Sequence, residues 1–491
     1  MQRWSRWSIA ALAFILGAVL SLTVIAPTSF FSPSTAAPAA LQVLAPVQQS
    51  AKDAQLPPRP PPPPPPPPPP ALRARPRRTF WSIDLHGGTR CDIATTLALG
   101  LDQHVIMAGH KRAGALHTSC MQPPGIRLPS HPLPPMLDRY TNSADYWDEA
   151  AVRAYFEHYA ADPEMQAVDA FVCMFPASHC EVFIPFNKTI IWQPAHRYAL
   201  GRCHTAARWA ALDAHMRAGA AARDVLAAAG RLDAEYMNYY TGLSPRVLSS
   251  NALWYLAPPK IWWTGDIPEV LLGPLQVAET PHLQAIEAAA ARAANVNGSG
   301  APPLLRFRTK GAYLEHDQEF ARFRAAVMLP YAALSYGITE LYALGTPMFA
   351  PTPEFSFELG LINDARMRDP WYCGDAAIAA APPRHSASRH VHDPESRERE
   401  PSLYWMQFHD VYTWPHITLF ASWDELIHKL LSADLPAIHS LMVRENWRRA
   451  AELQQQWGEI IDGIEIGRAV PPTWEAALAA LDVSRLMVDR R

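Results

Sequence analysis

The stretch SYGITELYALGTP, Ser335 to Pro347, contains small and acidic residues whose types and spacing could bind a ligand. The first turn of a helix presents unpaired N–H groups and a partial positive charge, so a helix that begins near Ser335 would bind a diphosphate. Ser335 supplies a hydroxyl donor, and Gly337 lets a phosphate approach the backbone. Glu340 would accept hydrogen bonds from the two free hydroxyls of a ribose. Gly345 and Pro347 would then turn the chain into the next strand.

A second candidate site is the turn HGG, which spans His86 to Gly88 and follows an apolar run. An imidazole has an unperturbed pKa near neutral pH, so His86 is a candidate base for a hydroxyl proton. Asp84 and Asp92 are alternative bases, and a purely structural role for His86 also stays open. Gly87 and Gly88 would let a sugar or a diphosphate approach the backbone.

Three basic residues are candidate phosphate ligands. Arg197 and Arg202 follow the end of an expected strand, and Lys310 follows the run LLRFRT. A guanidinium binds phosphate or an acidic acceptor through paired hydrogen bonds. Ordinary surface charge is the alternative for all three residues.

The cysteines suggest a disulfide rather than a metal site. Cys173, Cys180 and Cys203 cluster in the sequence, and in an oxidising compartment either Cys173–Cys180 or Cys180–Cys203 would be bridged. Zinc is disfavoured because no paired Cys-x-x-Cys or His spacing occurs. The motif RHVHD, Arg389–Asp393, lies in a polar segment and is expected to have no role.

Alternating strands and helices must position these residues. Continuous apolar strands without polar alternation are typical of parallel sheets with both faces covered. In the first region the pattern predicts strands at 80–85, 104–109, 169–175 and 188–193, and helices at 92–100 (with Asp92 as N-cap), 148–159 and 204–229. In the second it predicts strands at 260–265, 269–276, 304–309, 326–331 and 347–351, and helices at 281–294, 318–324, 335–344 and 423–464. The polar stretch Ala380–Ser402 is expected to be a disordered loop.

The first 78 residues predict an anchor and a stalk. Trp7–Ala26 is uncharged and long enough to span a bilayer, and Arg3 and Arg6 precede it, so the folded part would lie in the lumen. A cleavable signal peptide is the alternative, but its apolar core is usually shorter. The proline tract from Pro57 to Pro70 is stiff and extended, as in a stalk. Two sequons, at Asn187 and Asn297, suit a secretory compartment.

The chain therefore divides into five segments. These are a cytosolic tip with a transmembrane anchor (1–26), a Pro-rich stalk (27–78), an N-terminal Rossmann-like acceptor domain (79–250), a C-terminal Rossmann-like nucleotide-sugar domain with closing helices (251–464), and a tail (465–491). With 491 residues and 49% hydrophobic residues, two α/β domains facing a cleft are expected. The net charge of −3 gives no reason to expect a nucleic-acid partner.

The positions Ser335, Gly337, Glu340, Gly345 and Pro347 resemble the donor-sugar site of GT-B glycosyltransferases. The resemblance implies a nucleoside-diphosphate sugar with its diphosphate at the helix start and its ribose on Glu340. Many GT-B proteins place His-Gly-Gly just ahead of this helix, whereas LPYAAL precedes it here. Sequence segments such as LDAEYMNYYTGLSP also resemble those of a poorly characterised family of eukaryotic membrane-anchored GT-B-like proteins. This resemblance extends over most of residues 80–353.

The resemblance implies a metal-independent glycosyltransferase, anchored as a type II protein in the Golgi, that transfers a sugar to a glycan or glycoprotein. No cofactor is expected beyond the nucleotide sugar itself. A GT-A enzyme would need an Asp-x-Asp metal motif, and a serine hydrolase a Gly-x-Ser-x-Gly elbow; neither motif occurs. Two alternatives stay open: a Golgi sulfotransferase, for which HGGTRCD is an imperfect phosphosulfate loop, and a non-catalytic lumenal protein that binds glycans or nucleotide sugars.

Overall fold

The computed structural model describes residues 75–83, 87–108, 124–134, 137, 147–175, 177–195, 206–254, 256, 262–273, 281–296, 305–309, 319–330, 335–361 and 383–480. The chain divides into Met1–Pro61 and a compact unit, Pro62–Arg491, that holds both sheets. The expected anchor lies outside the described residues, and so does the stalk up to residue 74. Within the described ranges, no helix has both the length and the apolar character of a membrane span.

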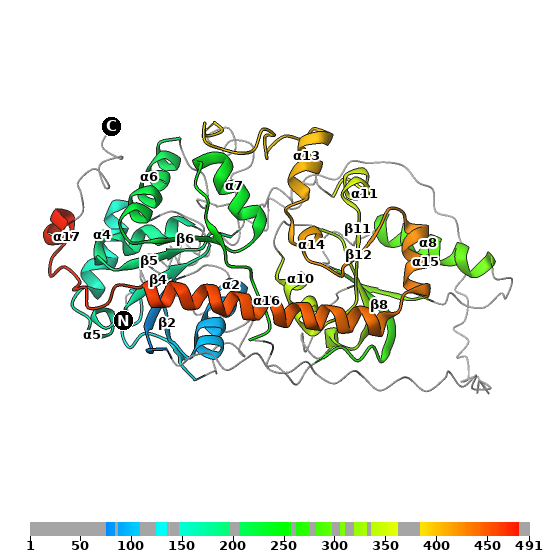
Figure 1. Cartoon of the computed structure of the whole chain (residues 1–491), viewed down its shortest axis with the longest axis horizontal. Coiled ribbons are helices and arrows are strands. Elements are labelled where there is room, and N and C mark those ends of the chain that lie inside the picture. Colours follow the sequence, from blue (N-terminus) through cyan, green and yellow to red (C-terminus); the bar gives the residue numbers. More distant parts are fainter. Residues whose placement is uncertain are drawn as a thin grey trace, which may run out of the picture. The chain divides into compact units, whose positions relative to one another are not determined.

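The first sheet has seven parallel strands in the order β3-β2-β1-β4-β5-β6-β7 (Figure 1). Their apolar residues are buried on both faces, which explains the lack of polar alternation in the sequence. The strands are β1 (Thr79–Ile83), β2 (His104–Ala108), β3 (Ile126–Arg127), β4 (Ala170–Cys173), β5 (Thr189–Trp192), β6 (Val225–Ala228) and β7 (Arg246–Val247).

Helices cover both faces of the first sheet. On one face, Trp81 of β1 packs with aromatic residues of α4 (Glu149–Tyr159) and of the 3₁₀ segment Ala177–Phe186. On the other face, Phe80 packs with α2 (Gly87–Thr95) and with the C-terminal half of α16 (Leu435–Gly463). Successive side chains of a strand point to opposite faces, so neighbouring residues of β1 enter different cores.

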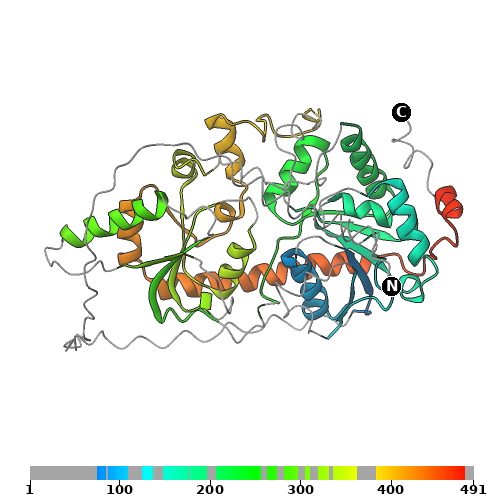
Figure 2. The ribbon, with the colours of Figure 1, turned by 180° about the vertical axis from the view of Figure 1, so that it is seen from behind.

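The second sheet has five parallel strands in the order β12-β11-β10-β8-β9. It consists of β8 (Ile267–Gly273), β9 (Phe307–Thr309), β10 (Phe323–Met328), β11 (Met348–Pro351) and β12 (Thr418–Phe420). One face is covered by α8 (Pro281–Val296) and α15 (Trp423–Ser432). The other is covered by α10 (Tyr336–Leu344) and by the N-terminal half of α16. Figure 2 shows the same elements from behind.

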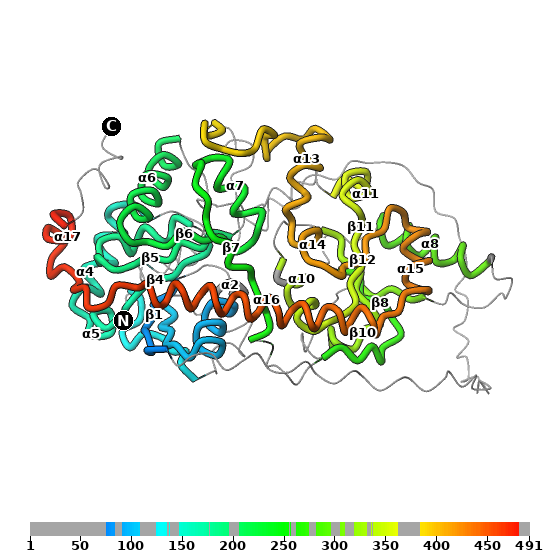
Figure 3. The backbone as a smooth tube through the Cα atoms, viewed as in Figure 1, coloured from blue at the N-terminus to red at the C-terminus, as the bar shows by residue number. Residues whose placement is uncertain are grey.

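Helix α16 belongs to the cores of both sheets. Met442 packs with the second sheet, and Trp457 packs with the first. The tube in Figure 3 follows this long orange-to-red helix past both sheets. The remaining helices are α5 (Pro163–Gln166), a π-helical turn that extends α2 (Thr96–Gly100), α6 (Ala206–Ala222), α7 (Arg231–Thr241), α11 (Pro353–Glu358), α13 (Arg399–Met406), α14 (Asp410–Thr413) and α17 (Trp474–Ala480).

The prediction of two parallel α/β sheets is confirmed, but several elements differ from expectation. The single helix expected over 204–229 is α6 followed by strand β6, because the alanines of VLAA favour helix locally while the sheet buries them. The residues described within the strand expected at 260–265 are irregular, and within 318–324 strand β10 begins at Phe323. Helix α2 begins at Gly87, so Asp92 lies inside that helix and is not its N-cap.

Candidate active site

Each sheet reverses its strand order at one point, and these points locate the candidate site. The reversal falls between β1 and β4 in the first sheet and between β8 and β10 in the second. Ligands of parallel α/β sheets bind beyond the carboxyl ends of the strands at such points. Gly87 and Gly88 open α2 just after β1, and α10 follows β10. The predicted base His86 and its alternative Asp84 lie outside the described residues.

The start of α10 leaves room for a ligand next to its backbone. Ser335 is the N-cap, with extended dihedral angles and no side-chain capping hydrogen bond. Its carbonyl oxygen accepts hydrogen bonds from the N–H groups of Ile338 and Thr339, at 3.0 and 3.1 Å. Within the described residues, a Cβ added to Gly337 would meet one atom, the Ser335 Oγ, at 3.6 Å. The backbone at Gly337 is therefore open to the approach of an anion such as a phosphate.

Glu340 is 3% exposed, so a ribose that contacts its carboxylate would itself have to be buried beside α10. Its role as a ribose ligand stays a prediction. Gly345 ends α10 in the left-handed conformation, with φ 70°, as the turn to β11 requires. A Cβ on Gly345 would lie 2.6 Å from Nδ1 of His439, which hydrogen-bonds the Gly345 carbonyl oxygen.

Asp92 is a buried carboxylate on α2. It is 3% exposed, and its Oδ1 accepts a hydrogen bond from the Asn251 backbone N–H at 3.0 Å. Burial raises the pKa of Asp92 to about 7, although hydrogen bonds from Asn251 and Ser250 and the charge of Arg449 act in the opposite direction. A carboxyl with this pKa suits general-base chemistry at neutral pH. Its hydrogen bonds also tie α2 to the chain that leads into the second sheet.

Asp410 is a second buried carboxylate, at the start of α14, and sequence reasoning missed it. It is 4% exposed, and burial raises its pKa to about 7 against the lowering effect of Arg449. The Arg449 guanidinium lies 3.7 Å above the Trp414 ring centroid and 5.5 Å from that of Tyr342. One half-buried arginine on α16 therefore acts electrostatically on carboxylates from both halves of the compact unit. The sequence FHDVYTW carries no motif that marks Asp410.

The polar segment expected to be a disordered loop is ordered where it is described, from residue 383 onward, and that prediction was wrong. We call residues 383–398 the strap. His390 of the strap is 2% exposed, and its ring nitrogens lie 2.9 Å from Glu235 Oε2 on α7 and 2.7 Å from the Tyr404 hydroxyl. Arg389 pairs with the same Glu235. The RHVHD motif thus has a structural role, because it fastens the strap to α7.

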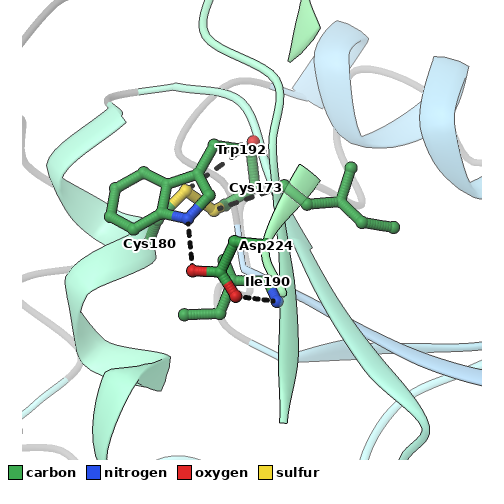
Figure 4. Close-up of a disulfide and its surroundings, with 6 residues drawn as sticks. Cys173, Cys180, Ile190, Trp192 and Asp224 are labelled. Atoms are coloured by element: carbon green, nitrogen blue, oxygen red, sulfur yellow. Dashed lines mark hydrogen bonds between the residues drawn. A yellow bond between two sulfur atoms is a disulfide. The ribbon is translucent and has the colours of Figure 1, made fainter. Parts of the chain in front are cut away.

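The predicted disulfide Cys173–Cys180 is present, with Cα atoms 5.7 Å apart (Figure 4). It joins the carboxyl end of β4 to the following 3₁₀ segment, next to the reversal point of the first sheet. Nearby, the Asp224 carboxylate accepts hydrogen bonds from the Ile190 N–H and the Trp192 Nε1–H, both at 3.1 Å. The disulfide thus fixes the end of β4 to the 3₁₀ segment, and the hydrogen bonds of Asp224 fix β5 to the residue just before β6.

Several predicted site residues lie outside the described residues, namely Arg197, Arg202 and Lys310, as does the sequon residue Asn297. The other sequon residue, Asn187, is described and accepts a hydrogen bond from Arg223 through its side-chain oxygen, at 3.0 Å. Among the described residues, no cluster of three or more His, Cys, Asp or Glu side chains is arranged to hold a metal ion.

No family model and no curated protein matches the chain. Among solved structures, the glycosyltransferase of kitacinnamycin shares 12% identity over 79% of this chain and 100% of its own, with a TM-score of 0.39. Glycosyltransferase VinC in complex with DTDP shares 10% identity over 79% and 100%, with a TM-score of 0.38. A UDP-N-acetylglucosamine 2-epimerase from Rickettsia bellii shares 10% identity over 74% and 98%, with a TM-score of 0.30.

Proposed function

We propose that the protein is a metal-independent glycosyltransferase that moves a sugar from a nucleoside-diphosphate sugar to a hydroxyl of a glycan or glycoprotein. The observation that carries the proposal is the pair of parallel sheets, each with one strand-order reversal and with a helix starting just beyond it. Such reversal points are where parallel α/β sheets bind nucleotides.

The second sheet is the proposed donor site. In the proposal, the diphosphate lies at the N-terminus of α10, where Ser335 supplies a hydroxyl and Gly337 leaves the backbone open. The partial positive charge of the helix start would stabilise the leaving diphosphate. Arg197, Arg202 and Lys310 remain proposed phosphate ligands, and Glu340 remains the proposed ligand of the ribose.

The proposed reaction is a direct transfer. A base removes the proton from the acceptor hydroxyl, the acceptor oxygen forms a bond to the anomeric carbon, and the bond from that carbon to the diphosphate oxygen breaks. His86 is the proposed base. Asp92 is the alternative base among the described residues, supported by its pKa of about 7 and its position on α2 after β1.

The proposed location is the Golgi membrane, with the uncharged run of residues 7–26 as a type II anchor and the folded part in the lumen. A disulfide in the first sheet fits an oxidising compartment. The domain boundaries at residues 78, 250 and 464 also remain part of the proposal.

The proposal is tested by adding a panel of nucleotides to the purified full-length protein and measuring its thermal denaturation. The panel contains UDP, GDP, dTDP and their sugar conjugates, with adenosine 3′,5′-bisphosphate as the probe for a sulfotransferase. We expect stabilisation by one nucleoside diphosphate and its sugar conjugate, followed by turnover of that conjugate. Stabilisation by the bisphosphate alone would favour the sulfotransferase, and binding without turnover on any acceptor would favour a non-catalytic protein.

The role of Glu340 has its own test, with Glu340→Gln as the matched variant because it keeps the size of the buried side chain. We expect weaker binding of the stabilising nucleotide with little change in the denaturation midpoint of the free protein. Unchanged nucleotide binding by Glu340→Gln would remove Glu340 from the donor site.

A further inference from the structure

The N-terminus of α7 lies beside two carboxylates that come from different parts of the chain. Gly230 is the N-cap of this helix and has no side-chain capping hydrogen bond. Among the described residues, a Cβ added to Gly230 would meet Oδ2 of Asp233, in the first turn of α7, and Oδ1 of Asp410, on α14, each at 3.4 Å. In the described part of the chain, the atoms that line the space over Gly230 are thus carboxylate oxygens.

One oxygen of the Asp410 carboxylate is an unsatisfied hydrogen-bond acceptor within the described part of the chain. Its Oδ2 is enclosed, and no group in the described part of the chain donates a hydrogen bond to it. Buried carboxylates ordinarily accept hydrogen bonds, because leaving one unsatisfied carries a large desolvation cost. The other oxygen of this carboxylate, Oδ1, faces the space over Gly230, so a ligand hydroxyl placed there would reach Oδ1 and give the carboxylate a hydrogen-bond donor.

The charges around Asp410 favour a neutral donor over a cation. The nearby Arg449 guanidinium already acts on Asp410, and the start of α7 adds a partial positive charge. These positive charges offset the two carboxylates, Asp233 and Asp410, so the site can take a neutral donor without a further cation. Among the described residues there is also no third ligand that would complete a metal site with Asp233 and Asp410. A hydroxyl group donates a hydrogen bond without adding charge.

We propose that Asp410 is a hydroxyl-binding residue, which accepts a hydrogen bond from a hydroxyl of the saccharide acceptor bound over Gly230 at the start of α7. This inference rests on the proposed function, because a saccharide acceptor is the polyhydroxylated substrate of that reaction. Helix α7 follows β6 of the first sheet, which is the proposed acceptor half of the molecule.

The test uses the full-length protein and two variants on a printed array of oligosaccharides. Asp410→Asn keeps the size of the side chain but removes its charge and one acceptor oxygen. Gly230→Ala places a methyl group at ordinary contact distance from both carboxylates, in a backbone conformation (φ −145°) that alanine adopts freely. Stabilisation of each protein by UDP, GDP and dTDP is measured in parallel and reports on the donor site.

We expect the wild-type protein to retain a set of oligosaccharides and both variants to retain them about tenfold less or worse. Nucleotide stabilisation of both variants and the denaturation midpoint of Asp410→Asn should not fall below those of the wild type. The midpoint of Gly230→Ala should fall only slightly, because alanine is a poorer N-cap than glycine. A wild-type protein that retains no oligosaccharide, or variants that retain the same set equally well, would overturn the inference. Asp410-dependent retention without any nucleotide binding would support this site while removing the proposed transfer reaction.

Discussion

Replacing Asp410 by Asn should make the protein more stable, and increasingly so as the pH rises. The pKa of Asp410 rises from 3.8 to about 7 on folding because the carboxyl is buried. Between these two pH values the folded chain binds one more proton than the unfolded chain. The carboxyl's contribution to the free energy of unfolding is therefore fully present below pH 3.8 and is lost as the pH approaches 7. The wild-type free energy of unfolding therefore carries a negative term of about 1.4 kcal/mol per pH unit across this window.

Across the whole window the free energy of unfolding of the wild type falls by an amount on the order of 4 kcal/mol. Asp410→Asn does not show this fall, because the asparagine side chain does not titrate. Urea unfolding at pH 4.5, 5.5, 6.5 and 7.5 gives the free energy of unfolding of each protein. The difference between Asp410→Asn and the wild type should grow by about the same 1.4 kcal/mol per pH unit between pH 4.5 and 6.5 and level off above pH 7.

The control for this measurement is Asp424→Asn, which alters a carboxylate that is exposed and paired with the exposed Arg292. It should change the free energy of unfolding by less than about 0.5 kcal/mol at each pH. A variant of Asp410 that is less stable than the wild type at every pH would contradict this prediction. That result would mean that donors satisfy the carboxylate in solution and that its role is structural.

Two further predictions concern elements that position the site. Gly345→Ala should lower the free energy of unfolding by about 2–4 kcal/mol, because the left-handed backbone disfavours alanine and its Cβ would collide with His439; urea unfolding measures this, and a loss below about 0.5 kcal/mol would contradict the geometry. His390→Ala should cost about 2–4 kcal/mol and speed tryptic cleavage within residues 383–398, because Glu235 and Tyr404 each lose a buried partner. Unchanged cleavage would mean that His390 does not hold the strap.

The parallel sheets were predictable because their signal is local. Runs such as AFVC and TIIW are apolar on both faces, and this pattern occurs in few other contexts. The helix start at Ser335 and the left-handed turn at Gly345 also follow from residue types within a few positions of each other. Local preference failed at β6, where alanines in a buried strand gave a helical pattern.

The buried charges were not predictable, because their signal is not local. His390 and Glu235 are 155 residues apart in the sequence, and nothing near either of them indicates that they meet. The polar composition of the strap suggested that it is exposed to solvent. In the structure, Arg389 and His390 of the strap instead pair with the buried carboxylate of Glu235. Asp410 and Asp92 likewise become unusual carboxyls only when folding removes water from them and brings Arg449 near.

The most direct test of the proposed donor site is calorimetric titration of UDP, GDP and dTDP into the wild-type protein and into Gly337→Ala. Of the described atoms, the added methyl group would meet Ser335 Oγ alone, at 3.6 Å, and alanine favours helix more than glycine does, so the variant should fold at least as stably as the wild type. The account predicts that one of these nucleotides binds the wild-type protein and that Gly337→Ala binds it at least tenfold more weakly, because the methyl group occupies the approach to the helix start. Equal binding of that nucleotide by both proteins, or no binding of any of the three by the wild type, would contradict it.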